Sequence, residues 1–77
     1  MLIKTSRGSV VLGVGSKQVS IWGESYYPDN EEPYFMAYSK MLTKWDDGSP
    51  FAPGDVELIM QTLVSDYQGT GMGLIWD

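Results

Sequence analysis

One helix is the clearest element of the sequence, and it lies in residues 53–68, which read PGDVELIMQTLVSDYQ. Its apolar residues recur at i, i+3, i+4, i+7, i+8 and i+11, the spacing of one apolar stripe on an α-helix; they are Val56, Ile59, Met60, Leu63, Val64 and Tyr67. Pro53 suits the first helical position, and Asp55 and Glu57 place negative charge at the positive end of the helix dipole. We expect this helix to pack onto a sheet through Ile59, Met60 and Leu63.

Upstream of the helix, the sequence has the pattern of a β-hairpin. Residues 9–15 read SVVLGVG, a β-branched run that ends in a glycine turn. Residues 17–24 then alternate, with Val19 and Ile21 on one face and Trp22 on the other. Because the hairpin and the helix each have an apolar face, we expect the two to cover each other.

The other segments complete the expected architecture. Residues 28–33 read PDNEEP, and two prolines with four polar residues predict a projecting loop rather than a central strand. Residues 46–50, DDGSP, predict a turn. We expect further extended segments at residues 2–4, 34–38, 40–45 and 72–76. The predicted fold is α+β in a single domain over residues 1–77, with one antiparallel β-sheet meander packed by a single C-terminal α-helix and followed by a last short strand.

The composition narrows the chemistry open to this protein. It has no cysteine and no histidine, which excludes disulfides, thiolate catalysis, sulfur-ligated zinc and the Ser-His-Asp arrangement. Asp46, Asp47 and Gly48 could suggest calcium, but the full spacing of a calcium loop is absent and an ordinary turn is the better interpretation. We therefore expect no cofactor, no metal and no enzymatic activity. A hydrolase with paired carboxylates is the remaining catalytic alternative, and no spacing fixes such a pair.

Charge and hydropathy limit the partners and the location. Five basic residues against ten acidic ones give a formal net charge of -5, which disfavours nucleic acid as a partner. The first residues lack the apolar core of a signal peptide, and no segment approaches the roughly 20 apolar residues of a membrane span. We expect a cytoplasmic protein that binds no membrane.

Several short motifs stand in the order found in a known family. They are TSRG at residues 5–8, VSIWGE at 19–24 and WDDGSPF at 45–51, followed by the amphipathic helix, a glycine and a short apolar strand. The pattern resembles the immunity proteins of bacterial polymorphic-toxin systems, specifically the family catalogued as immunity protein seventy-four. The resemblance implies inhibition of a cognate protein toxin, encoded beside this gene, by direct binding without catalytic residues.

The candidate binding residues are aromatic and acidic. If Val19 and Ile21 face the helix, Trp22 points to the opposite face of the sheet, where no second helix exists to cover it. That face is a binding surface or a homodimer seam, unless the sheet curls and buries Trp22 against its own far edge. The neighbouring aromatic and loop residues that complete the candidate partner-binding site are Tyr26, Tyr27, Asp29, Glu31 and Glu32.

Two interpretations of the loop carboxylates stay open. They could steer a cationic partner and accept hydrogen bonds from its arginines, or they could simply be solvated and favour solubility.

The leading hypothesis for the function is an immunity protein that neutralises a toxin by non-catalytic binding. The alternative is a small homo-oligomeric structural or phage accessory protein whose exposed sheet face pairs with itself.

Overall fold

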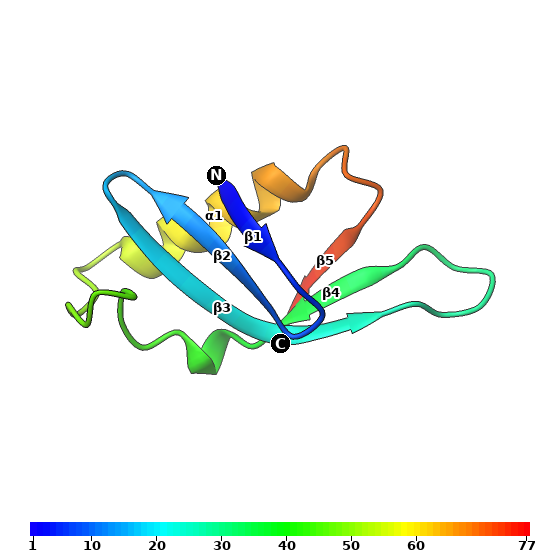
Figure 1. Ribbon diagram of the computed structural model, residues 1–77, viewed down its shortest axis with the longest axis horizontal. Coiled ribbons are helices and arrows are strands. Elements are labelled where there is room, and N and C mark those ends of the chain that lie inside the picture. The colour runs from blue at the N-terminus through cyan, green and yellow to red at the C-terminus, as the bar shows by residue number, and fades with distance from the viewer.

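Five strands form one sheet in their sequence order in the computed structural model, which describes residues 1–77 (Figure 1). The strands are β1 (Leu2–Thr5), β2 (Ser9–Val14), β3 (Lys17–Tyr26), β4 (Tyr34–Ala37) and β5 (Gly73–Trp76). β1 to β4 run antiparallel, whereas β5 runs parallel to β4. Helix α1 (Asp55–Tyr67) lies between β4 and β5 in the sequence and supplies the crossover that parallel neighbours need. The predicted α+β fold is confirmed, with a mixed sheet.

The hairpin of β2 and β3 carries the centre of the core. Its strands pair Val10 with Ile21 and Leu12 with Val19, so all four side chains lie on one face. Gly15 adopts φ 62° in the two-residue turn between the strands, a left-handed conformation that glycine accepts at little cost. The predicted hairpin is therefore confirmed.

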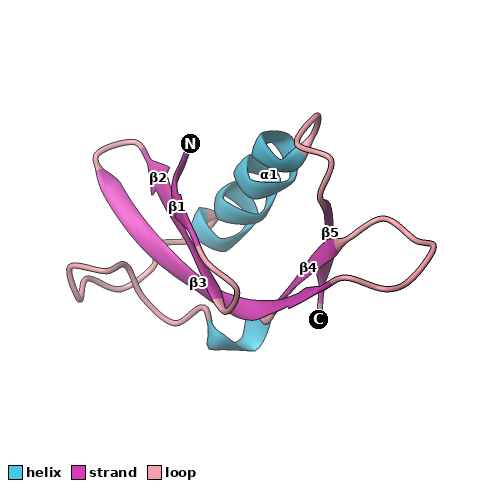
Figure 2. Ribbon diagram, turned by 45° about the vertical axis from the view of Figure 1, so that its right-hand side comes forward, coloured by secondary structure: helices cyan, strands magenta, loops and turns pink.

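Helix α1 covers this face of the sheet, and Figure 2 shows it on one side only. Ile59 and Leu63 are fully buried, and Tyr67 is 8% exposed. They pack in one cluster with residues of all three central strands, namely Val10, Leu12, Val19, Ile21, Phe35 and Ala37. Met60 is half-buried and Val64 is 43% exposed, so the buried stripe is narrower than the sequence pattern predicts.

The helix begins at Asp55 rather than at the predicted Pro53. Gly54 has φ 89°, which is left-handed and keeps the preceding proline out of the helix. The Asp55 carboxylate accepts hydrogen bonds from the backbone N–H of Ala52 at 2.7 Å and from Nε1 of Trp45 at 3.3 Å. A carboxylate at the helix start thus holds the preceding loop in place.

The predicted extended segment at residues 40–45 is wrong over its first two residues. They belong to a short 3-10 helix, η1 (Ser39–Met41), with backbone hydrogen bonds from Met41 to Tyr38 and from Leu42 to Ser39. The chain is extended again at Leu42, and Lys44 forms an isolated antiparallel bridge with Pro50. Trp45 then turns inward, where it is 4% exposed and its ring meets that of Phe51 edge-on at 5.3 Å. Burying this large ring is favoured over continuing a strand.

The turn at residues 46–50 forms as predicted, and it closes the edge of β3. The Asp46 carboxylate accepts hydrogen bonds from the Ser20 backbone N–H at 2.8 Å and from the Ser20 hydroxyl at 3.0 Å. The Asp46 N–H donates in turn to the Gln18 carbonyl at 2.9 Å. Lys17 pairs with Asp47 at 3.1 Å. These contacts give Asp46 and Asp47 structural partners within the protein.

The molecule is elongated, with principal extents of 41 × 21 × 19 Å. Figure 1 shows the connection between β3 and β4 extending from one end of the body. This connection contains the predicted loop at residues 28–33, which has no strand or helix. The structure contains no helix of the length and apolar character needed to cross a membrane.

Candidate functional site

The face of the sheet that α1 leaves uncovered carries a group of aromatic side chains around one carboxylate. Alternation along β3 places Trp22, Glu24 and Tyr26 on this side, because Val19 and Ile21 face the core. Neighbouring residues from β4 and its end lie opposite them. We call this group the aromatic face and define it as Trp22, Glu24, Tyr26, Tyr34, Met36 and Tyr38.

Cross-strand pairing brings the members of the aromatic face together. Tyr26 is opposite Tyr34, and their rings stack with centroids 5.1 Å apart at an interplanar angle of 21°. Glu24 is opposite Met36. The Tyr38 backbone N–H donates to the Trp22 carbonyl at 2.8 Å, which continues the pairing beyond β4. Such aromatic cross-strand pairs stabilise a sheet while leaving their outer surfaces free for contact.

Glu24 lies at the centre of this arrangement. Its Oε2 accepts hydrogen bonds from the hydroxyls of Tyr26 at 2.9 Å and Tyr38 at 3.3 Å. The hydrogen bond to Glu24 is the main cause that raises the pKa of Tyr26. Burial is the main cause that raises the pKa of Tyr38, with repulsion from Glu24 as the next. Both tyrosines therefore stay protonated and keep donating to the carboxylate, which holds it in a fixed position.

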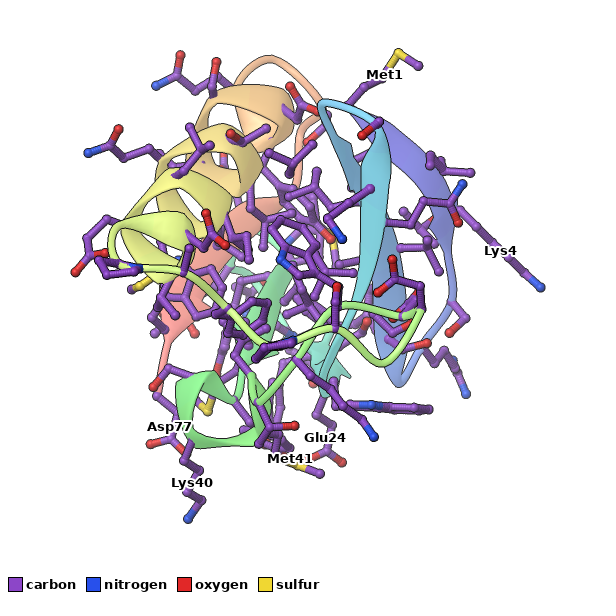
Figure 3. The ribbon with its side chains drawn as sticks, turned by 90° about the vertical axis from the view of Figure 1, so that its left-hand side faces the viewer. Met1, Lys4, Glu24, Lys40, Met41 and Asp77 are labelled. Atoms are coloured by element: carbon purple, nitrogen blue, oxygen red, sulfur yellow. The ribbon has the colours of Figure 1, made fainter.

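Trp22 and Glu24 are the exposed members of the aromatic face, and its other four residues are half-buried. Trp22 is 51% exposed, so the alternative in which the sheet curls and buries it is wrong. Figure 3 shows Glu24 at the bottom of the view, projecting on the side away from α1, where Met41 of η1 also projects. Exposed Trp and Tyr are the residues most enriched at interface hot spots.

The three loop carboxylates lie beyond the end of the aromatic face. Asp29, Glu31 and Glu32 are exposed, and none of them takes part in an ion pair or a side-chain hydrogen bond within the protein. The stacked pair of Tyr26 and Tyr34 stands where β3 and β4 lead into this loop. The loop thus extends the negative charge of Glu24 away from the body of the protein.

Tyr27 is the one predicted site residue that lies elsewhere. Alternation turns it away from Tyr26, and its ring lies 6.0 Å from the guanidinium carbon of Arg7. It is 61% exposed and lines a pocket together with Tyr67 of α1, on the helix side of the sheet. The structure therefore places Trp22 and Tyr26 on the same face of β3 and separates Tyr27 from them.

Sequence reasoning missed Glu24 and Met36 and left Tyr34 and Tyr38 outside the site. The period-2 alternation that places Trp22 on the outer face also places Glu24 there, so this residue was accessible from the pattern. Assigning the residues of β4 to this face requires the register in which β4 pairs with β3. That register depends on the conformation of the long loop between the two strands, which the sequence pattern does not give.

The structure has no group of three or more Asp or Glu residues arranged to hold a metal ion. Comparisons of the sequence and structure with protein-family models, with curated proteins and with solved structures find no match.

Proposed function

We propose that this protein is an immunity protein that neutralises a cognate bacterial toxin by direct, non-catalytic binding, with the aromatic face as the contact. The observation that carries the proposal is the exposed Trp22 on the sheet face that α1 leaves uncovered, beside the half-buried tyrosines that hold the exposed Glu24 carboxylate. The family resemblance of the motifs at residues 5–8, 19–24 and 45–51 supports the class of partner. Cytoplasmic residence, where the protein protects the producing cell, is part of the proposal.

The chemistry of the aromatic face favours a basic side chain of the partner. A lysine or arginine that reaches Glu24 meets a carboxylate already held by two tyrosine hydroxyls. It also meets the faces of Trp22 and the stacked tyrosines, which attract cations through their π systems. Because the carboxylate is positioned before binding, the partner loses less freedom in forming the contact.

The loop supports the same choice of partner. Asp29, Glu31 and Glu32 have no cation within the protein to neutralise them, and the formal net charge is -5. Long-range attraction speeds the encounter with a basic surface, whereas the aromatic contacts slow its release. We therefore propose a toxin with a basic surface, and neither nucleic acid nor membrane as the partner.

The test is co-expression with the product of the adjacent gene. We expect the parent protein to restore growth and to co-purify with that product in a stoichiometric complex. The variant Glu24→Gln keeps the shape of the side chain and removes its charge, and we expect it to protect poorly. A matched change on the exposed side of α1, Glu57→Gln, removes the same charge elsewhere and should protect like the parent. Absence of any complex with the parent would overturn the proposal.

The second candidate is a homo-oligomer that buries the same face between two copies. It is favoured by the exposure of Trp22, together with the position of β5 at the open edge of the sheet. Such edges invite pairing with another polypeptide. Light scattering of the purified protein decides between the toxin-binding protein and the homo-oligomer. A stable dimer that the substitution Trp22→Ala converts to a monomer supports self-association. A monomer at all concentrations supports a different partner.

A further inference from the structure

A second site lies on the helix side of the sheet, away from the aromatic face. It is a pocket of about 500 Å³, within the range of about 300–1,000 Å³ of small-molecule sites. The end of β1 and the following turn, the end of β3, and the segment around the end of α1 form its walls. The lining residues are Leu2, Thr5, Ser6, Arg7, Ser25, Tyr27, Tyr67, Thr70 and Met72.

The charge of this pocket is opposite to that of the whole protein. None of the ten acidic residues lines it, and Arg7 is its one charged lining residue. The two ion pairs of the structure involve the N-terminal amino group and Lys17, so Arg7 has no carboxylate partner. Its guanidinium carbon lies 6.0 Å from the centre of the Tyr27 ring, which places the cation at the pocket wall. A guanidinium binds a carboxylate through two parallel hydrogen bonds.

The pocket also offers neutral donors and an apolar surface. Neither the Tyr27 nor the Tyr67 hydroxyl makes a hydrogen bond within the protein, although Tyr67 is only 8% exposed. Burial raises the pKa of Tyr67, and the nearby Tyr27 adds to this, so the Tyr67 hydroxyl stays a donor. Leu2 and Met72 supply apolar contact in the same pocket. Donors without a matching acceptor beside an apolar wall fit an amphipathic anion.

We propose that this pocket binds a monocarboxylate with an apolar body, whose carboxylate pairs with Arg7 while its body lies against Leu2, Tyr67 and Met72. A guanidinium pairs with carboxylates and phosphates alike, and the apolar side chains of Leu2 and Met72 favour an anion with an apolar body over inorganic phosphate. Such a carboxylate is a free small acid or the C-terminus of a peptide that ends in an apolar residue. The proposal does not depend on the aromatic face, because Ser25 and Tyr27 alternate with Glu24 and Tyr26 along the strand.

The test is nuclear magnetic resonance titration of the isotope-labelled parent protein with phenylacetate and with its uncharged amide. We expect phenylacetate to bind with a dissociation constant on the order of 1–10 mM, as its size allows, and to shift the amide signals of Arg7, Tyr27 and Thr70. The amide should cause no saturable shift. Equal binding of acid and amide, or shifts confined to other residues, would overturn the proposal. This comparison uses only the parent protein, so its result does not depend on whether a variant folds.

A variant then tests the cation directly. Arg7→Gln should weaken phenylacetate binding at least about tenfold, since it removes a charge-assisted hydrogen bond. The backbone carbonyl of Arg7 accepts a hydrogen bond from the Ser25 backbone N–H at 3.1 Å. The variant changes only the side chain and keeps this hydrogen bond. Lys44→Gln, at an exposed lysine outside the pocket, is the matched control and should bind like the parent. Unchanged binding by Arg7→Gln would contradict the proposal.

A further arm separates the two sources of the carboxylate. Tripeptides that end in phenylalanine are titrated with a free and with an amidated C-terminus. Tighter binding of the free peptide than of phenylacetate supports a peptide carboxyl terminus as the ligand, and the reverse order supports a small acid. Inorganic phosphate that competes as well as phenylacetate would overturn the carboxylate assignment.

Discussion

Gly23 is the residue at which the packing of β3 against β4 tolerates no side chain. A Cβ atom built there would meet the Met36 carbonyl oxygen, come within 2.7 Å of the Phe35 ring and lie 3.0 Å from Cα of Ala37. Two of these three contacts are backbone atoms of β4, and Phe35 is 1% exposed, so no flexible group can move aside. Overpacking a core costs about 1–3 kcal/mol and occasionally more, and we expect Gly23→Ala to cost at least about 3 kcal/mol.

This cost is large for a protein of 77 residues, whose free energy of unfolding is expected to be about 4–12 kcal/mol. Urea denaturation followed by tryptophan fluorescence measures it by linear extrapolation. The matched control is Gly13→Ala in β2, where the new Cβ would lie 3.1 Å from Cδ1 of the half-exposed Ile3, which can rotate away. We expect that control to lose less than about 1 kcal/mol. Equal losses in both variants would refute the close approach of β4 at Gly23.

Three further predictions concern the core, the aromatic face and the turn. Leu63→Ala removes a fully buried side chain and should lower the free energy of unfolding by about 2–5 kcal/mol, whereas a loss under about 0.5 kcal/mol in urea denaturation would take Leu63 out of the core. Glu24→Gln removes the carboxylate that raises the pKa of Tyr26, so that pKa should fall toward 10.0 in an ultraviolet titration of tyrosinate; no change would show that the hydrogen bond is not formed in solution. The hydrogen bonds from Ser49 are the main cause that lowers the pKa of Asp47 from 3.8 to about 2. Because folding lowers this pKa, the Asp47 carboxylate stabilises the folded state above pH 3.8, and this stabilisation is lost as the pH falls toward 2. In Asp47→Asn, the free energy of unfolding should therefore fall less steeply between pH 3.8 and pH 2 than in the parent. An equally steep fall in both proteins would contradict this.

The elements with strong local patterns were predictable from sequence. The stripe of α1 and the alternation of β2 and β3 each repeat over enough residues to fix the type of element. The helix start was misplaced by two residues, because the left-handed Gly54 separates Pro53 from the helix. The direction of β5 was not predictable, since alternating residues look the same in parallel and antiparallel strands.

The prediction for Trp45 fails because of contacts across the turn that follows it. Trp45 continues a strand-like pattern, yet its burial depends on Phe51 and on the Asp55 carboxylate, which lie beyond the turn. In the candidate site, the exposure of Trp22 followed from alternation and is confirmed. Tyr26 and Tyr27 are neighbours in the sequence, but neighbouring residues of an extended chain point to opposite faces, so the structure separates them.

The central claim is that the aromatic face and its acidic loop bind a cationic partner protein, and the dissociation rate of the purified pair formed with the adjacent gene product tests it most directly. Trp22→Ala should raise the off-rate by about 30-fold, as loss of an interface hot spot does. The matched control Leu58→Ala, at an apolar residue of α1 that is 48% exposed, should leave it unchanged. Replacing Asp29, Glu31 and Glu32 together should instead lower the on-rate and flatten its dependence on salt. If Trp22→Ala and the triple loop variant both bind like the parent while Leu58→Ala releases the partner faster, the contact lies on the exposed side of α1 and the account is contradicted.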